Sequence, residues 1–422
     1  MTPRKKKAAT GCYHCGSSEH RARDCPIAEC RLCGEKGHDT GGCPQRELPP
    51  VDKGDFTTSR RRRSQEDSTF TFAELFAGIG GFRIALEKLG GKCVFASEVD
   101  RFARKNYHTN FGDRPAGDIC RIETDDIPDH DVLVGGFPCQ PFSSSGKREG
   151  LGDPRGVLFR EIVRILQSKQ PKVLLLENVR GLSTHDEGNT LALIIGELEA
   201  SGYVVSSSLV DVVKLLPQER CRLYIVGIRK DLSEMPYKFP ILPDLRRGVA
   251  DIWHQDGDEL SQQQLESLLL SPHQLEKVRC QAYTQKFPEA RFLSDPQMPT
   301  KTLQSSYTKY MVGSQFIPAE NEKDWRRFSS REAARLQGFP EDFQLCRERS
   351  YHLLGNAVAP PVVAMIAAPL LQCMGISTPE QNIDNKWGWD VVKEMLLEAA
   401  PQDSRRSKLE SRLELIGNHV VN

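Results

Sequence analysis

Apolar segments of strand length alternate with segments of helical periodicity along most of this 422-residue chain. Residues 70–82 read as a strand that enters a glycine-rich turn, and residues 83–90 continue with apolar side chains at helical spacing. Further strands, with helices between them, are predicted at residues 92–100, 130–139 and 171–179. Strands that alternate with helices favour an α/β fold with a parallel, doubly wound sheet, whose ligands bind beyond the carboxyl ends of the strands.

The turn after the first of these strands contains Gly78, Gly80 and Gly81, which let the backbone approach a ligand closely. Glu98 ends the next strand, roughly twenty residues further along, where a carboxylate can accept hydrogen bonds from ribose hydroxyls. Dinucleotide sites and adenosylmethionine sites share this pattern. The glycines and the acid therefore predict a nucleoside-containing ligand without deciding between the two.

Further motifs accompany the glycine turn. In order, they are FAGIGGF at 76–82, Glu98, GDI at 117–119, FPCQPFS at 137–143, ENV at 177–179, QERCR at 218–222, REAARLQGFP at 331–340 and GNAV at 355–358. Over residues 70–375 the chain resembles the DNA cytosine-5 methyltransferases. The resemblance implies a Rossmann-like, S-adenosylmethionine-dependent methyltransferase fold with a small target-recognition domain, and methyl transfer to C5 of cytosine in DNA.

The resemblance also implies a pocket for S-adenosylmethionine. Glu98 would hold the ribose, and Asp118 and Ile119 would lie at the adenine. The full implied set is Phe76, Ala77, Gly78, Gly80, Gly81, Phe82, Glu98, Val99, Asp118, Ile119, Pro138, Asn356 and Val358. An alternative stays open for three of them, because Phe76 and Val358 could be core residues and Asp118 could cap a helix.

Cys139 is the predicted nucleophile. Cytosine C5 is a poor nucleophile, and addition of a thiolate to C6 makes the ring electron-rich enough to accept a methyl group. Pro138 and Pro141 fix the backbone around this cysteine. A buried, inert cysteine is the alternative, and it suits the other cysteines of residues 70–422 better. The attack reaches the face of the ring only when the base has left the stack.

The next predicted strand ends in Glu177, which follows several apolar residues. Burial there is expected to raise the pKa of its carboxyl group, which suits it to donate a proton or a hydrogen bond at cytosine N3. The resemblance assigns Arg222 to cytosine O2, and Arg220 to holding the pocket or a phosphate. It also implies that Asn178 braces the cysteine loop and that Gln140 belongs to the catalytic set.

Residues 141–156 are rich in serine and glycine and are predicted to form a loop that closes over the nucleic acid. Between residues 227 and 328 the motifs stop, as expected of a target-recognition segment. Residues 271–312 carry six Lys and Arg against three acidic residues, a modest bias toward phosphate. The implied DNA-binding residues are Ser145, Lys147, Arg148, Arg155, Gln218, Thr302 and Leu303.

The first 43 residues contain two copies of the spacing C-x2-C-x4-H-x4-C. The ligand sets are Cys12, Cys15, His20, Cys25 and Cys30, Cys33, His38, Cys43. Three thiolates and one imidazole complete a tetrahedral zinc shell, so two Zn²⁺ ions are predicted. Both copies resemble the CCHC zinc knuckle, which generally binds single-stranded nucleic acid, DNA or RNA. A protein-interaction knuckle or a purely structural zinc clip is the alternative.

Charge is distributed unevenly. Residues 1–63 carry 14 Lys and Arg against 8 Asp and Glu, on a chain whose formal net charge is zero. A basic head suggests contact with an anionic polymer, although a solubilising tail would look the same. The runs 4–7 and 60–63 could also be nuclear-import signals, so an intracellular and specifically nuclear location is expected. No apolar stretch approaches the ~20 residues of a membrane helix, so no membrane contact is expected.

These features divide the chain into expected parts: tandem knuckles at 1–46, a basic linker at 47–69, the catalytic and cofactor-binding core at 70–229, the target-recognition region at 230–328, a return to the catalytic core at 329–375 and a helical tail at 376–422. The tail contains apolar residues at helical spacing. It could pack back on the domain, the favoured alternative, or bind a partner. Neither the oligomeric state nor the target sequence can be derived.

Two other functions compete with a DNA methyltransferase. An RNA cytosine-5 methyltransferase would keep the chemistry, but the complete Gln-x-Arg-x-Arg at 218–222 and the absence of a Cys-Phe-Thr signature favour DNA. A non-catalytic nucleic-acid-binding protein would be expected to have lost Cys139 or Glu177. Both are present.

Overall fold

The computed structural model describes residues 52–54, 68–138, 157–253, 261–310, 313–319, 323–346, 349–375 and 386–420. The chain divides into two units, Met1–Val51 and Asp52–Asn422, and all the described residues belong to the second. Both predicted zinc sets lie outside the described residues, as do Cys139 and the loop that follows it to Gly156.

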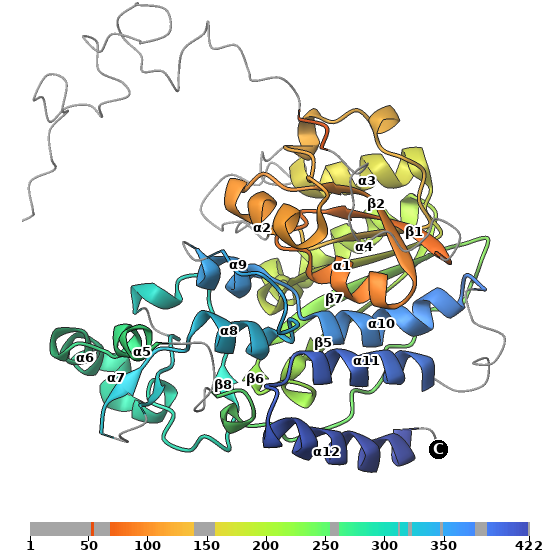
Figure 1. The fold of residues 1–422 in the computed structure, drawn as a ribbon. Coiled ribbons are helices and arrows are strands. Elements are labelled where there is room, and N and C mark those ends of the chain that lie inside the picture. Colours follow the sequence, from red (N-terminus) through yellow and green to blue (C-terminus); the bar gives the residue numbers. More distant parts are fainter. Residues whose placement is uncertain are drawn as a thin grey trace, which may run out of the picture. The chain divides into compact units, whose positions relative to one another are not determined.

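A six-stranded sheet forms the centre of this unit (Figure 1). Its strands lie in the order β2-β1-β3-β4-β7-β5. Their bounds are β1 Phe70–Leu75, β2 Gly91–Ser97, β3 Val132–Gly135, β4 Val173–Val179, β5 Tyr203–Asp211 and β7 Cys221–Arg229. β1, β3 and β4 are almost entirely buried, as expected of parallel strands covered on both faces.

The doubly wound sheet is confirmed, but it is mixed, so the prediction of parallel strands is wrong for one of them. β2, β1, β3 and β4 pair in parallel, whereas β7 pairs antiparallel with both β4 and β5. The reason is the short connection between β5 and β7, which consists only of residues 212–220. A parallel crossover needs a dozen residues or more, so a strand that returns this soon must run the other way.

The winding changes direction at β1. β2 lies on one side of β1, and β3 lies on the other. Doubly wound sheets bind their ligands at such a point, beyond the carboxyl ends of the two strands. The turns that follow β1 and β3 approach each other here, since a Cβ atom on Gly135 would lie 3.6 Å from the ring of Phe76.

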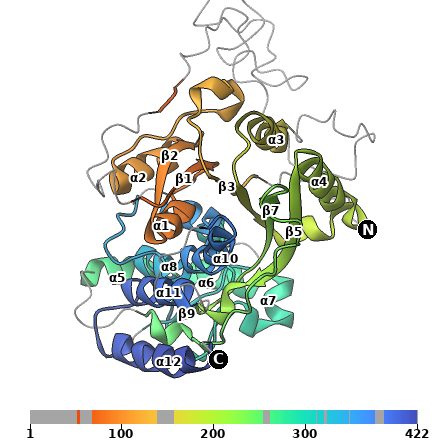
Figure 2. The ribbon, with the colours of Figure 1, turned by 90° about the vertical axis from the view of Figure 1, so that its right-hand side faces the viewer.

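Helices cover both faces of the sheet (Figure 2). α1 (Gly81–Lys88) and α2 (Arg101–Phe111) share one apolar core with α10 (Pro360–Gln372), and α3 (Val157–Lys169) and α4 (Asn189–Ala200) form the other. The ends of α2 follow from its sequence. Asp100 caps it by accepting a hydrogen bond from the Phe102 amide at 2.7 Å, and Gly112 ends it in the left-handed conformation.

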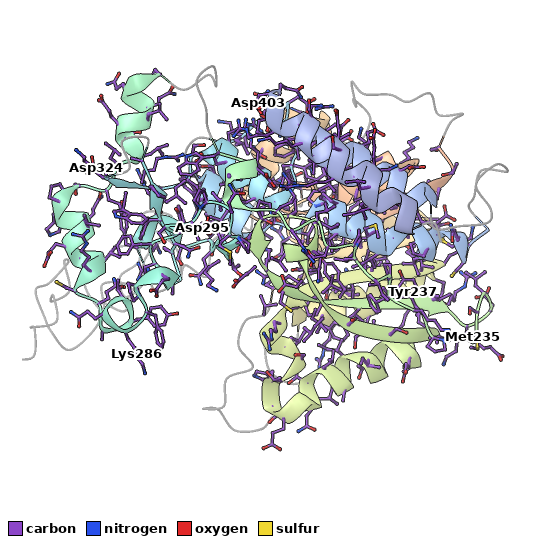
Figure 3. The ribbon with its side chains drawn as sticks, turned by 90° about the horizontal axis from the view of Figure 1, so that it is seen from below. Met235, Tyr237, Lys286, Asp295, Asp324 and Asp403 are labelled. Atoms are coloured by element: carbon purple, nitrogen blue, oxygen red, sulfur yellow. The ribbon has the colours of Figure 1, made fainter. Side chains whose placement is uncertain are left out.

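The segment after β7 forms short elements around a small apolar core. They are α5 (Gln262–Leu268), α6 (Pro272–Arg279), α7 (Ala282–Lys286) and the paired strands β9 (Ile317–Pro318) and β10 (Trp325–Arg326). Leu270, Val278 and Phe316 pack together here. The buried guanidinium of Arg291 donates to the carbonyl oxygens of Ser314 and Tyr310. These hydrogen bonds connect two loop segments that lie outside the helices and strands. Figure 3 shows the side chains of this region, with Lys286, Asp295 and Asp324 labelled.

One short parallel pair connects this region to the sheet. β6 (Gln218–Glu219) precedes β7 directly, and it pairs with β8 (Thr300–Lys301). Short 3-10 helices complete the connections, at Ile119–Arg121, Thr124–Asp126, Arg180–Ser183, His185–Gly188, Val212–Lys214, Val249–Asp251, Pro288–Ala290 and Tyr307–Lys309.

The C-terminal part consists of helices. α8 (Ser330–Gln337) begins with a capping box, in which Ser329 and Glu332 each bond the other's backbone amide. α9 (Ser350–Asn356) and α10 follow, and α11 (Lys386–Glu398) and α12 (Ser404–Val420) lie beyond α10 (Figure 1).

The tail packs on the catalytic unit, as favoured from the sequence. Trp389, Met395 and Leu396 of α11 belong to the same buried core as α10. Lys88 at the end of α1 pairs with Glu394 at 2.7 Å and with Glu398 at 2.5 Å. Apolar packing against α10 and ion pairs to Lys88 therefore both hold α11 against the catalytic unit.

The expectation that no apolar stretch approaches the length of a membrane helix is wrong if only length and composition are considered. Within the described residues, Ser350–Gln372 is long and apolar enough to qualify, with a mean hydropathy of 1.7 over its best window. Of that window, 89% is buried inside the fold, where α10 packs between α1 and α11. Helices buried on all sides in a soluble core pass the same test.

Replacement of Trp389 by alanine is expected to lower the free energy of unfolding by about 3 to 5 kcal/mol, because the indole is 1% exposed and its removal leaves a cavity against α10. Urea denaturation measures the change. Leu415→Ala on α12 is the matched control, since Leu415 is 68% exposed and its loss should change stability by less than ~0.5 kcal/mol. Equal effects of the two substitutions would contradict this packing.

Candidate active site

The glycine turn after β1 has one side packed and one side open. Gly80 is the N-cap of α1 with φ 87°, and a Cβ atom there would lie 2.3 Å from the Phe111 ring. Gly78 has φ 55°, and a Cβ atom there would meet nothing within 4 Å. Packing against Phe111 therefore requires a glycine at position 80. Gly78 exposes its backbone to open space, where a ligand could approach it closely.

Glu98 ties the ends of β1 and β2 together. Its carboxylate accepts hydrogen bonds from the Gly78 amide at 2.8 Å and from the Asp100 amide at 2.7 Å. Burial raises its pKa, and the backbone hydrogen bonds oppose that rise. The Glu98 amide donates to the carbonyl oxygen of Ala116 at 3.0 Å, which brings the segment carrying Asp118 to the same edge.

Other members of the predicted cofactor set lie around these residues. Gly81 contacts the GNAV motif, since a Cβ atom there would be 2.7 Å from Cγ2 of Val358. Val358 is buried in the core, which is the alternative weighed for it from the sequence. Asp118 does cap a short helix, accepting from the Cys120 amide at 3.1 Å, and Ile119 is buried. Val99 is 69% exposed and is free to cover a ligand.

This donor set fits a nucleoside-containing cofactor. The Glu98 carboxylate accepts backbone amides on both oxygens, and a carboxylate offers about four lone-pair sites, so it keeps acceptor capacity for a ribose hydroxyl. Gly78 provides the open backbone, and Val99 provides an exposed apolar surface beside it. Ala77, Phe82 and Val358 are buried around the turn. Phe76 is partly buried, and Pro138 and Asn356 are exposed.

The catalytic edge of the site centres on Glu177, at the carboxyl end of β4. Residues 222 and 224 of β7 face the same side as Glu177, so Arg222 lies diagonally across from it. Their side chains form an ion pair, with 3.2 Å between Arg222 Nε and Glu177 Oε1. A Cβ atom on Gly136 would lie 3.5 Å from Glu177 Oε2. The carboxyl group therefore stands beside the backbone that leads into Pro138.

Two opposing influences act on the Glu177 carboxyl group. Burial raises its pKa, whereas the charges of Arg222 and Arg220 lower it, and burial prevails. A carboxyl group in this setting retains its proton to higher pH than an exposed glutamate does. It is suited to donate a proton or a hydrogen bond, as the sequence predicts.

Asn178 anchors the chain just before the predicted nucleophile. Its side-chain amide donates to the carbonyl oxygen of Phe137 at 3.0 Å, and its side-chain oxygen accepts from the Val179 amide at 2.8 Å. β4 therefore fixes the backbone two residues before Cys139. Cys139 and Gln140 themselves lie outside the described residues, as do Ser145, Lys147, Arg148 and Arg155.

Arg220 is a buried junction. Its guanidinium donates to the carbonyl oxygens of Leu303 at 3.3 Å, Gly355 at 3.1 Å and Ala357 at 2.6 Å. Of the two roles expected for it, holding the pocket agrees with this geometry, because a guanidinium that is 2% exposed and shared among carbonyls is not available to a phosphate.

Gln218 and Leu303 have a packing role in place of the expected DNA contact. Gln218 is fully buried, donates to the carbonyl oxygen of Leu336 at 3.0 Å and accepts from the Leu303 amide at 2.7 Å. Leu303 is 2% exposed. Thr302 donates to the carbonyl oxygen of Glu219 at 2.6 Å. The three residues join the recognition region to the sheet, and burial leaves Gln218 and Leu303 no surface for DNA.

Two supporting residues were missed in the sequence. Asp211 accepts from the backbone amide of Arg220 at 3.0 Å, which fixes the start of β7. Gly355 permits the recognition region to approach, since a Cβ atom there would be 2.3 Å from the Ser305 amide nitrogen. A glycine inside the GNAV motif could have indicated close packing at Gly355. Nothing in the sequence distinguishes Asp211 from other acidic residues in loops.

Two family models match the chain. The C-5 cytosine-specific DNA methylase model matches residues 70–372, and the zinc knuckle model matches residues 11–27. The zinc knuckle model covers the first of the two predicted ligand sets, and both sets lie outside the described residues, so the knuckle assignment rests on the sequence alone.

Curated relatives are similar over most of their length. The type II methyltransferase M1.ScrFI of Lactococcus lactis subsp. cremoris is 41% identical, over 74% of this chain and 80% of its own. M.DsaV of Dactylococcopsis salina is 35% identical, over 83% of this chain and all of its own. M.MspI of Moraxella sp is 37% identical, over 78% of each chain.

Solved structures share the fold. The Dnmt2 methyltransferase of S. pombe has a TM-score of 0.57 at 22% identity, over 73% of this chain and all of its own. EhMeth of Entamoeba histolytica has a TM-score of 0.58 at 19% identity, over 72% of this chain and 98% of its own. With the family model across residues 70–372, the chain belongs to the C-5 cytosine-specific DNA methylases and is a DNA cytosine-5 methyltransferase with a zinc knuckle at residues 11–27.

Proposed function

We propose that Cys139, Glu177 and Arg222 carry the methylation of a cytosine extruded from DNA. The observation that carries this assignment is the Glu177–Arg222 ion pair, at 3.2 Å, beside the backbone that Asn178 fixes two residues before Cys139. An acid that keeps its proton and a fixed cation are the groups that a flipped pyrimidine needs at N3 and O2.

The chemistry begins with the Cys139 thiolate, which adds to C6 of the ring. As the S–C6 bond forms, the C5=C6 electron pair moves to C5, and Glu177 donates to N3 so that the charge spreads into the ring. Arg222 donates to O2 and holds the base in this orientation. S-adenosylmethionine, which the glycine turn and Glu98 would hold, supplies the electrophilic methyl group that C5 accepts, and S-adenosylhomocysteine is the leaving group. Transfer of the C5 proton to solvent returns its bonding electron pair to the C5=C6 bond, which expels the Cys139 thiolate, and N3 returns its proton to Glu177 as the ring becomes aromatic again.

The remaining roles follow from the residues around this centre. Lys147, Arg148 and Arg155 bind phosphates of the DNA as the loop closes over it. Arg220 does not contact DNA and instead positions β7, and with it Arg222, against the GNAV segment.

The knuckles add a second nucleic-acid contact. We propose that Cys12, Cys15, His20 and Cys25 bind one zinc ion and that Cys30, Cys33, His38 and Cys43 bind a second, because the spacing of the two sets is the same. Each Cys3His site has a net charge of −1 with Zn²⁺ bound, so the head stays positive overall and can approach a nucleic-acid strand.

Replacement of Cys139 by serine is expected to abolish methyl transfer from labelled S-adenosylmethionine to duplex DNA. The wild-type chain should also form a denaturant-resistant complex on a 5-fluorocytosine oligonucleotide, because the C5–F bond blocks release of the thiolate. Cys120→Ser, which alters an exposed cysteine on a 3-10 helix, is the matched control and should keep full activity. Label that enters transfer RNA alone would overturn the choice of DNA, and label transferred by the serine variant would overturn the nucleophile.

Replacement of Glu177 by glutamine is expected to lower kcat roughly 10²- to 10⁴-fold, with little change in cofactor affinity, because the amide cannot transfer a proton to N3. The raised pKa of Glu177 means that the wild-type rate falls on the alkaline side as the acid loses its proton. The glutamine variant should lose this limb of the pH profile. An unchanged limb, with kcat measured from pH 6 to pH 10, would assign the titration to another group.

Zinc analysis of chain purified without chelator is expected to give two ions per molecule. Cys15→Ser and Cys33→Ser should each reduce the count to one, because each removes a thiolate from a different set. One ion in the wild-type chain and none after Cys15→Ser would restrict the metal to residues 11–27.

A further inference from the structure

A segment upstream of the methylase domain packs against the predicted cofactor edge. Residues 52–54 precede the family match, which begins at residue 70, and they lie within the expected linker. The carbonyl oxygen of Asp52 accepts from the Gly117 amide at 2.8 Å. Its carboxylate accepts from the guanidinium of Arg104 on α2 and from the Gly54 amide, the latter at 3.0 Å. This turn is tied to the domain through its backbone and its side chain alike.

Gly54 completes the contact by close packing. Its φ is 78°, and a Cβ atom there would lie 2.5 Å from the Arg114 carbonyl oxygen and 2.7 Å from the Ala116 amide nitrogen. Any other residue would be strained and would push against backbone, which cannot move aside as a flexible side chain can. We name Asp52 and Gly54 together the clip.

The clip holds the segment from Arg114 to Gly117 from the outside. Arg104, which pairs with Asp52, also donates to the Pro115 carbonyl oxygen at 3.1 Å. The inner side of the same segment is bonded to β2, with the Ala116 amide donating to Ala96 at 2.8 Å. The segment is therefore clamped between the clip and the strand that ends at Glu98.

Two of the predicted adenosine contacts, Glu98 and Asp118, depend on this segment. The Glu98 amide donates to the Ala116 carbonyl oxygen at 3.0 Å, and Asp118 follows Gly117 directly. Partial burial would raise the pKa of Asp52, but the hydrogen bonds from Arg104 and Gly54 lower it below its ordinary value, so the carboxylate is charged when it meets the guanidinium.

We propose that the clip is a positioning element for the adenosine moiety of the cofactor, supplied by the chain between the knuckle and the methylase domain. The inference rests on the proposed cofactor roles of Glu98 and Asp118. Without the clip, the Gly117 amide loses its acceptor and Arg104 loses its carboxylate, so the segment occupies its binding-competent position for a smaller fraction of the time. The apparent cofactor affinity falls in proportion to that fraction.

Full-length Asp52→Ala and Gly54→Ala variants test the clip, with S-adenosylhomocysteine as the calorimetric probe. Both should bind it roughly 5- to 20-fold more weakly and raise the KM for S-adenosylmethionine by a similar factor. The kcat at saturating cofactor and the KM for DNA should stay within about twofold, because neither residue approaches Glu177 or Arg222. Lys53→Ala is the matched control, since Lys53 pairs instead with Asp126 at 2.6 Å and its side chain is 60% exposed.

A Glu98→Ala variant separates the two hypotheses. If Glu98→Ala binds S-adenosylhomocysteine as tightly as wild type, the proposed cofactor site is wrong and the clip has no ligand to position. If Glu98→Ala binds weakly while Asp52→Ala binds normally, the cofactor site stands and the clip is refuted. A fall in kcat and in DNA affinity that parallels a lower melting temperature in Asp52→Ala would make the segment a general stability element and also refute the clip. Asp52→Ala decides the matter should Gly54→Ala fail to fold, because the Asp52 side chain is partly exposed.

Discussion

The buried guanidinium of Arg220 joins three parts of the chain that are remote in sequence. Arg220 directly precedes β7, and its donors reach the recognition region at Leu303 and the GNAV segment at Gly355 and Ala357. Carbonyl groups buried without a donor are costly, and a buried cation without acceptors is more costly still, so these groups require one another. Their mutual satisfaction fixes where β7 lies, and β7 carries the arginine that faces Glu177.

Burial raises the pKa of both glutamates at the site, but different groups oppose that rise. On the cofactor side, Glu98 is stabilised by backbone amides, which suit a carboxylate that must accept hydrogen bonds. On the catalytic side, Glu177 has apolar strands beneath it and one arginine beside it, and burial has the larger effect on its pKa. Glu98, which follows β2, is thus surrounded by backbone donors, whereas Glu177 in β4 faces arginine side chains.

The sequence predicted the features that depend on local pattern. The first strands, the glycine turn, Glu98 and Glu177 were all recognisable, because an apolar run that ends in a turn and an acid is a local signal. The reversed direction of β7 was not, since it depends on a connection too short for a crossover. The burial of Gln218 and Leu303 was missed because the two residues pair with each other although 85 positions separate them in the chain. The residues next to each of them in the sequence do not indicate such a partner. Asp52 and Gly54 gave only an ordinary turn signal, and their role depends on backbone far along the chain.

The helices at the C-terminus have a consequence for how this enzyme can be dissected. The family match ends at residue 372, yet α11 covers α10 with its own apolar residues and reaches back to α1 through Lys88. A fragment that ends at the family boundary would lack α11 and would expose the apolar side chains of α10 to water. Such a fragment would tend to self-associate. Anyone who grafts this catalytic module onto another targeting domain should therefore attach the fusion after α12 and leave the ending intact.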